Sequence, residues 1–333
     1  MKKISWLMLG LLVLCLCGCG KTSGQEVQSS EAASSQSAVS EPAPLPEGPL
    51  TIEELRVEFP RDGADPSALM TAVRELPEAM QKALEEQGVF VEEVSVTMGA
   101  SAAATALAVA EGGVDIAFLP VEKLVQAESD AEVLLLSGMM EQDLGDDPAA
   151  WNEEAAPGVK TPGQRMLLCT APTVYGDNLS GRKNPTWEEL DHARWGVLGS
   201  DSLLGYRAVE LWLADHYEGN GLVDLAHVTM YPSWEELFQA AENGEVDVLP
   251  AMSAHLQEKS ALRVIGVTER LYTMAAIAGE KEELSDPRFG KAMESAVKTL
   301  QEPYGLLFGM ESYAVGSGDA LDAQRRIAVL TGE

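Results

Sequence analysis

Short runs of strand-forming residues alternate with segments of helical pattern along most of the chain, from Leu50 onward. In the first run, 55–59, apolar residues occupy alternate positions, which is typical of a strand with one buried face. A helix is expected next, from Pro66 to Gly88, and Pro77 inside it is expected to kink or divide it. This alternation favours α/β units with largely parallel sheets over a sandwich.

The pattern predicts two blocks of such units. The predicted strands are 55–59, 89–97, 114–119, 133–136, 166–169, 195–198, 228–231, 246–249 and 272–278. The predicted helices are 66–88, 101–111, 122–127, one that starts near 203, and 286–300, with 305–330 helical or mixed. We expect residues 49–140 and 271–333 to form a discontinuous lobe 1 and residues 164–270 to form lobe 2. The segment 141–163 carries six acidic residues and one lysine and is expected to be a crossing loop.

Two segments of equal length, 101–115 and 233–247, repeat one pattern: a serine, a helical stretch, a glycine and a strand that begins Val-Asp. Two similar lobes would produce this repeat. So would any pair of ordinary helix–strand units, because each needs an N-cap serine and a glycine near the helix end. In both segments the aspartate, Asp115 or Asp247, falls at the start of the strand, so we interpret both aspartates as structural.

The first twenty residues have the pattern of a targeting segment. Two lysines precede an apolar run from Ile4 to Cys17, which is too short to cross the ~30 Å of bilayer hydrocarbon as a helix. The run ends Leu-Cys-Gly-Cys, which resembles a bacterial lipobox and predicts a signal peptide, 1–18, cleaved before a lipidated Cys19. An ordinary signal peptide with incidental cysteines is the alternative. Two or more acyl chains on Cys19 would anchor the protein stably to a membrane.

Residues 19–48 are predicted to be a flexible tether, because they are rich in Ser, Ala, Gln, Glu and Pro and lack aromatic residues. Cleavage would leave Cys169 as the one cysteine of the folded part, so no intrachain disulfide is expected. The apolar run around Cys169 favours a small buried side chain over a reactive thiol.

Composition excludes several classes of function. The 333 residues include 53 acidic and 23 basic side chains, and a formal net charge of −30 would repel a nucleic acid at long range. The four histidines have no metal-ligand spacing, and no nucleophile elbow, P-loop or dinucleotide-binding motif is present. We therefore expect a protein that is not an enzyme and that uses no metal or cofactor.

One loop has the character of an anion site. The sequence Gly199-Ser200-Asp201-Ser202 lies between a predicted strand and a predicted helix, whose first backbone N–H groups have no partner within the helix. Ser202 would add a hydroxyl to the site or serve only as an N-cap. Similar helix starts occur at Ser101 and at Ser233-Trp234, and three such starts facing one cleft would form a pocket for a small solute.

From about Leu55 to the C-terminus the chain resembles the phosphate/phosphite/phosphonate-binding proteins of ABC importers, which belong to the two-lobed type II periplasmic binding proteins. The resembling stretches are 113–120, 186–190 with Gly196-Val197, 200–206, 233–247 and 266–269. The resemblance implies an α/β fold of two lobes with a ligand cleft between them. It also implies a monomer at the outer face of the cytoplasmic membrane that hands a small solute to an ABC permease.

The chain departs from the family at the ligand loops. The family's Ser-Ser-Thr-Ser-Gly-Tyr reads Asp-Ser-Leu-Leu-Gly-Tyr in 201–206, and its Ser-His-Asp reads Ser233-Trp234-Glu235. The family's tyrosine after the 114–119 strand is Leu124. Fewer hydroxyls and an added carboxylate disfavour a doubly charged phosphonate, whereas backbone donors would still hold a carboxylate or a zwitterion. Arg61 would compensate as a cation or is simply an exposed arginine.

These observations predict an extracytoplasmic lipoprotein that binds a small anionic or zwitterionic solute. The predicted ligand-binding residues are Ser101, Ser200, Asp201, Ser202, Tyr206, Ser233, Trp234 and Arg61. Two alternatives remain open. One is a ligand sensor that docks on a membrane receptor, and the other is a surface lipoprotein whose cleft has degenerated and no longer serves a permease.

Overall fold

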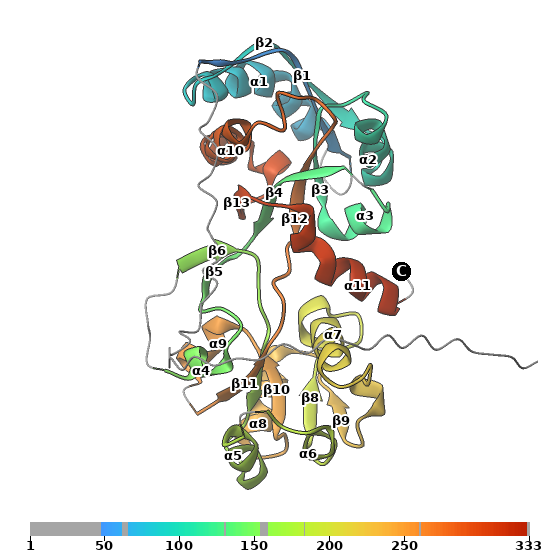
Figure 1. The fold of residues 1–333 in the computed structure, drawn as a ribbon, viewed down its shortest axis with the longest axis vertical. Coiled ribbons are helices and arrows are strands. Elements are labelled where there is room, and N and C mark those ends of the chain that lie inside the picture. The colour runs from blue at the N-terminus through green and yellow to red at the C-terminus, as the bar shows by residue number, and fades with distance from the viewer. Residues whose placement is uncertain are drawn as a thin grey trace, which may run out of the picture. The chain divides into compact units, whose positions relative to one another are not determined.

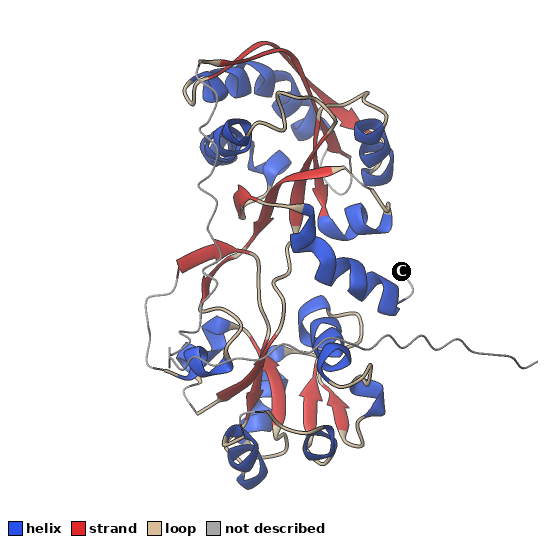
Figure 2. Ribbon diagram, viewed as in Figure 1, coloured by secondary structure: helices blue, strands red, loops and turns tan. Residues whose placement is uncertain are grey.

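The computed structural model describes residues 48–61, 66–129, 131–153, 159–182, 184–259 and 261–331. The predicted signal peptide, the lipidated Cys19 and the tether up to residue 47 lie outside the described residues. From Gly48 onward the chain is one compact unit with two lobes of mixed α/β structure, which confirms the predicted fold class (Figures 1 and 2). Within the described ranges, no helix combines the length and the apolar character needed to cross a membrane.

Lobe 1 is built on a six-stranded sheet with the order β13-β4-β12-β3-β1-β2. Its first part comprises β1 (Leu50–Pro60), α1 (Pro66–Glu85), β2 (Val89–Gly99), α2 (Ala102–Ala110), β3 (Ile116–Pro120), α3 (Val121–Gln126) and β4 (Glu132–Gly138). Its second part comprises β12 (Met274–Ala278), α10 (Pro287–Phe308), β13 (Ser312–Val315), the short turn η3 (Gly318–Leu321) and α11 (Asp322–Thr331). Lobe 1 is therefore discontinuous, and Figure 1 shows its orange and red segments packed among its blue and green ones.

Lobe 2 is built on a five-stranded sheet with the order β11-β7-β10-β8-β9. The chain forms β7 (Leu167–Thr170), α5 (Val174–Ser180), α6 (Trp187–Asp191), β8 (Trp195–Val197), the π-helical turn η1 (Leu203–Arg207) and α7 (Ala208–His216). It continues with η2 (Leu222–Asp224), β9 (Val228–Met230), α8 (Trp234–Glu242), β10 (Val248–Ala251), α9 (Ser253–Glu258) and β11 (Arg263–Val267).

The two sheets share one topology. In lobe 1, β2, β1 and β3 are parallel and β12 joins them antiparallel, with β4 on its other side. In lobe 2, β9, β8 and β10 are parallel, and β7 and β11 take the places of β12 and β4. The repeat noticed in the sequence thus coincides with two lobes of equal strand order.

Two connections join the lobes, and both leave each sheet at the same edge. The first runs from the end of β4 through β5 (Met140–Asp143) and β6 (Val159–Pro162) to β7, and the second runs from β11 to β12. The strand directions place each junction at the edge where the parallel strands of that lobe have their carboxyl ends. The connection therefore joins the two carboxyl edges, whatever the angle between the lobes.

The segment expected to be a crossing loop contains regular structure instead. Residues 141–163 include most of the β5–β6 hairpin, which forms its own two-stranded sheet, and α4 (Pro148–Asn152). Its acidic residues are used in the fold: Asp147 caps α4 through Ala149 N–H, at 3.0 Å, and Asp143 accepts ion pairs from Arg165 and Arg270. The acidic composition suggested a crossing loop. The segment is ordered instead because Asp143 pairs with arginines that lie further along the chain.

Two helices also differ from their predictions. Helix α1 is one element from Pro66 to Glu85 that includes Pro77, so the division that was one of the two expectations for Pro77 does not occur. Helix α10 continues past Leu300 to Phe308, with non-helical dihedral angles at Tyr304, directly after Pro303. Proline in each helix removes one backbone donor, and α10 consists of two helical stretches that meet at a kink at Tyr304.

The cores of the lobes are apolar and well filled. In lobe 1 the rings of Phe59, Phe118 and Phe308 pack with centroids 5.0–5.3 Å apart. In lobe 2, Trp195 and Cys169 are buried, and burial raises the pKa of the Cys169 thiol, so the cysteine is inert as predicted.

Candidate functional site

A buried aspartate ties together the central strands of each lobe. Asp115 accepts the backbone N–H of Arg56 at 2.8 Å and its Nε and Nη2 groups at 3.1 and 2.7 Å. Asp247 accepts the same three groups of Arg194 at 3.0, 2.9 and 2.7 Å. Both carboxylates lie where β3 and β10 begin, at the edge opposite the connection. They are structural, as expected from the sequence, and the site must be sought at the carboxyl edge.

Three serines cap helices at the carboxyl ends of the strands. Ser101 Oγ accepts Ala104 N–H at 3.2 Å, Ser202 Oγ accepts Gly205 N–H at 3.0 Å, and Ser233 Oγ accepts Glu236 N–H at 3.2 Å. Each hydroxyl therefore serves as an N-cap, the simpler of the two roles considered for Ser202. A hydroxyl that accepts a backbone hydrogen bond still has its own hydrogen to donate, so capping does not remove these groups from a site.

The loop before η1 is exposed at Ser200 and Asp201. The Ser200 carbonyl accepts Arg207 Nε at 3.3 Å, which holds the loop against the first turn. Asp201 lines a cavity of about 190 Å³ that is bounded by residues of α3, η1 and α11. The other residues of the lining are Glu122, Val125, Gln126, Leu203, Arg207, Gln324, Ile327 and Ala328.

The two predicted aromatic residues pack against different clusters of lobe 2. Trp234 contacts the rings of Phe238 and His255, with centroid distances of 6.0 and 5.4 Å, and a buried cluster that includes Met166. Tyr206 packs against a cluster around Trp195. That both residues border one cleft stays a prediction.

Leu203, Leu204 and Met252 join Trp234 at the same buried cluster. The two leucines were noted in the sequence as departures from the family, but Met252 was missed. Its signal was its position: it follows β10 directly, so it stands at the carboxyl end of a parallel strand. The Gln164 amide donates to Met252 Sδ at 3.4 Å, and Met252 N–H donates to Nδ1 of His255 at 3.1 Å. Burial lowers the pKa of His255, which favours the neutral ring.

The remaining predicted positions lie on lobe 1. Arg61 is exposed just after β1, and Ser101 is half-buried at the start of α2. Leu124, which stands where the family has a tyrosine, is buried in the core of lobe 1 and is only 4% exposed. Lobe 1 thus presents fewer polar side chains at its carboxyl edge than the family pattern implies.

A buried ion-pair cluster supports the connecting segments. Asp143 on β5 lies 3.3 Å from Arg165 Nε and 3.2 Å from Arg270 Nη2. The two guanidinium groups also donate to backbone carbonyls, Arg165 to Thr268 at 2.9 Å and Arg270 to Gly163 at 2.6 Å. Each arginine therefore bridges two of the connecting segments. This cluster holds the connecting segments together. Within it, Arg165 Nε and Arg270 Nη2 are buried and form ion pairs with Asp143 but have no hydrogen-bond partner among the described residues.

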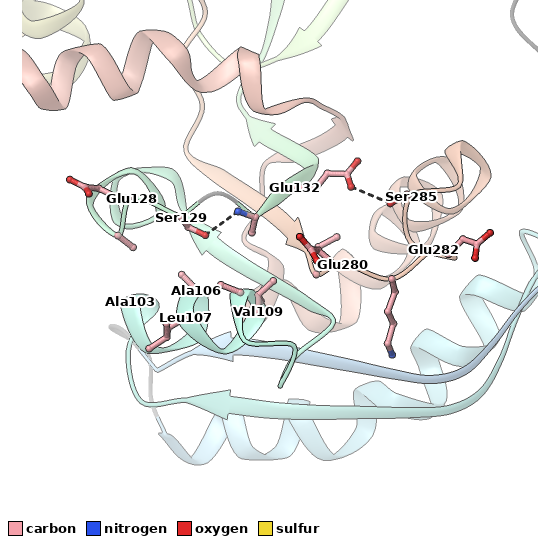
Figure 3. Close-up of a pocket in the computed structure, with 16 residues that line it drawn as sticks. Ala103, Ala106, Leu107, Val109, Glu128, Ser129, Glu132, Glu280, Glu282 and Ser285 are labelled. Carbon is pink, nitrogen blue, oxygen red and sulfur yellow. Dashed lines mark hydrogen bonds between the residues drawn. The ribbon is translucent and has the colours of Figure 1, made fainter.

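A wider hollow of about 790 Å³ lies on lobe 1, away from the predicted residues. Figure 3 shows it beside α2, the start of β4 and the segment after β12, with Glu128, Glu132, Glu280 and Glu282 around it. This is the edge opposite the carboxyl ends, and one of its hydrogen bonds joins Ser285 Oγ to Glu132, at 3.3 Å. Among the residues that the structure describes, no group of three His, Cys, Asp or Glu side chains is arranged to hold a metal ion.

Comparisons with known proteins show the fold. No protein-family model matches the sequence, and no curated protein matches it. Among solved structures, the chain is similar to transferrin 1 from Manduca sexta, with 12% identity and a TM-score of 0.54, over 84% of this chain and 47% of that one.

Two further similar structures come from bacterial transport proteins. One is PhnD1 from Prochlorococcus marinus in complex with methylphosphonate, with 13% identity and a TM-score of 0.37, over 84% of this chain and 98% of that one. The other is a binding protein component of an ABC phosphonate transporter from Pseudomonas aeruginosa, with 13% identity and a TM-score of 0.33, over 86% and 87%. The two-lobed α/β fold itself is given by the sheets of this chain.

Proposed function

We propose that this protein binds a small anionic or zwitterionic solute between its two lobes and hands it to an ABC permease. The observation that carries the proposal is topological. Both connections between the lobes, one through the β5–β6 hairpin and one from β11 to β12, join the carboxyl edge of one sheet to the carboxyl edge of the other, and open α/β sheets bind ligands at that edge. Two lobes that close about these segments would bury a solute, with closure driven by tighter binding to the closed form.

The donors at this edge support a compact polar head group. The capped starts of η1, α8 and α2 each present backbone N–H groups, and η1 has Ser200 and Asp201 beside it. The predicted lipobox at Cys19 supports an anchor at the outer face of the membrane, where a permease would be within reach of the tether. The proposed contacts are those predicted from the sequence: Ser101, Ser200, Asp201, Ser202, Tyr206, Ser233, Trp234 and Arg61.

The test is a thermal-shift screen on the protein without residues 1–18, together with native mass spectrometry of the freshly purified sample. Phosphate, phosphonates, sulfonates, carboxylates and amino acids would be tried one class at a time. A true ligand at 100 times its Kd is expected to add about 2.7 kcal/mol to the free energy of unfolding.

Two results distinguish the alternatives. A flat response to every class, with no solute retained in native spectra, would support a degenerate cleft. A ligand that binds but is not taken up by vesicles carrying the permease would support a sensor. A charge-reversed loop variant, Asp201→Lys, should strengthen binding of anions relative to the unchanged protein if this loop contacts the head group.

A further inference from the structure

Four apolar side chains lie just beyond the carboxyl ends of the three parallel strands of lobe 2. Leu203 and Leu204 follow β8, Trp234 follows β9 and Met252 follows β10. All four are half-buried and pack against one buried cluster, whose members are Met166, Ala208, Leu211, Leu271, Ala323 and Ile327. We call these four side chains the apolar wall.

The apolar wall is held in place by the residues behind it. Trp234 is packed against the rings of Phe238 and His255, which are themselves 4.5 Å apart. Met252 is held by the Gln164 amide at its sulfur and by His255 at its backbone. Side chains that are already ordered lose little conformational entropy when a ligand packs on them, so their apolar contact converts efficiently into affinity.

Polar groups lie beside the apolar wall, and Gln126, Asp201, Arg207 and Gln324 line one cavity together with Leu203. Ser202 and Ser233 each have one hydroxyl hydrogen left to donate, because their oxygens cap η1 and α8. Asp201 is an exposed carboxylate, which opposes a highly charged anion. This inventory can hold a compact head group, while any larger solute must place the rest of its surface against leucine, indole and thioether.

We infer that the solute is amphipathic: a small anionic or zwitterionic head bearing an aliphatic or aromatic group that packs on Leu203, Leu204, Trp234 and Met252. The inference rests on the proposed function and specifies its ligand class. Burial of one methylene contributes about 0.8 kcal/mol, so each added methylene that reaches the wall should tighten binding about fourfold.

The experiment measures Kd by calorimetry along homologous series that keep the head group constant. Alkylphosphonates and alkylsulfonates from methyl to hexyl, with the phenyl members, and amino acids from glycine to norleucine and phenylalanine are the probes. The expected result is a series in which Kd falls about fourfold per methylene over the first few members. Binding of the shortest member with a flat or rising Kd along every series would overturn the inference and leave the proposed function standing. No binding in any series would overturn both.

Variants assign the effect to the apolar wall. Trp234→Ala and the double change Leu203→Ser with Leu204→Ser should each flatten the dependence on chain length, whereas Trp234→Phe should preserve most of it. The double change also keeps the test valid if Trp234→Ala fails to fold, since the leucines are only half-buried. Leu107→Ser is the matched control, because Leu107 is 57% exposed on α2 and lines the separate hollow of lobe 1. An unchanged chain-length dependence in the leucine variant would contradict the assignment.

Discussion

Each lobe contains one buried aspartate whose removal should destabilise the sheet of that lobe. Asp115 and Asp247 are each 2% exposed, and each joins the strand it starts to the neighbouring parallel strand through an arginine. A buried carboxylate with this many donors stabilises mainly because its loss leaves those donors unpaired. The arginine side chains are partly exposed, so water can replace some of the hydrogen bonds that they would lose.

We expect Asp247→Asn to lower the free energy of unfolding by about 1–3 kcal/mol, because the amide cannot satisfy the guanidinium and the Arg194 N–H together. Urea denaturation at neutral pH would measure the loss. Glu242→Gln is the control, since Glu242 forms a solvent-exposed ion pair with Lys259 that should contribute little to stability. Equal losses in the two variants would contradict the role given to Asp247.

Stability should also fall in acid. Burial alone would raise the pKa of Asp115, Asp143 and Asp247, but hydrogen bonds and nearby cations more than offset it, so all three pKa values lie below the ordinary one. Such groups bind more protons in the unfolded chain, so their stabilisation is present above the unfolded pKa, about 3.9, and is lost as pH falls through the folded values.

The urea midpoint is therefore expected to drop as pH is lowered below about 4. Glu141 acts in the opposite direction, because burial raises its pKa. Its protonation as pH falls towards about 4 removes a destabilising buried charge, so it should slightly increase stability in that range. In a protein with both Asp115→Asn and Asp247→Asn, the urea midpoint should fall less steeply as pH is lowered. If its dependence on pH matched that of the unchanged protein, these pairs would not be its source.

Among the elements, the hairpin of β5 and β6 meets the end of β4 at two glycines in close contact. A Cβ on Gly138 would lie 2.6 Å from Cα and N of Gly163, which has a φ of +93°. Backbone atoms cannot move aside as a flexible side chain can. These two positions therefore define how closely the connecting segments approach each other.

Gly138→Ala is expected to lower the free energy of unfolding by about 1–3 kcal/mol through overpacking. Gly181→Ala is the matched control, because its Cβ would meet backbone oxygens at ordinary distances of 3.6 Å or more and its φ is negative. That change should be neutral or stabilise by about 0.4–1 kcal/mol. Differential scanning calorimetry would compare them, and an unchanged Gly138→Ala protein would show that the segments can separate without cost.

Much of this element-level picture was predictable from the sequence, and the exceptions have physical causes. Long runs such as 89–97 and capped helices such as the one at Ser233 depend on local pattern, and the structure contains both. Strands β5 and β6 have the sequences Met-Glu-Gln-Asp and Val-Lys-Thr-Pro and lack an apolar run, and Asp143 of β5 depends on Arg165 and Arg270, which follow later in the chain. The serine caps were predicted because they depend on local sequence. The grouping of Met252 with Trp234 was not, because it depends on which strands are neighbours in the sheet.

At the scale of the whole molecule, charge works against the compact state. A formal net charge of −30 implies repulsion over the entire surface, which added salt screens within a Debye length of about 10 Å at 0.1 M. We expect the melting temperature to rise when sodium chloride is increased from about 10 to about 200 mM, the range over which that length shortens most. The same scan with an uncharged osmolyte is the control, because an osmolyte is excluded from the protein surface but does not screen charge. A falling melting temperature would mean that ion pairs outweigh the repulsion.

Each sheet contains one antiparallel strand next to its parallel strands, β7 in lobe 2 and β12 in lobe 1. β7 comes first among the strands of its lobe, whereas β12 comes late, so the two lobes are completed at different times during synthesis. All strands of lobe 2 lie within residues 167–267, whereas β3 and β4 of lobe 1 wait for β12, more than a hundred residues later. A chain that emerges from its amino end can therefore finish lobe 2 first. Until β12 and β13 arrive, β3 has one open edge and β4 has two. This interval is when the nascent protein is most vulnerable to aggregation and most in need of a chaperone.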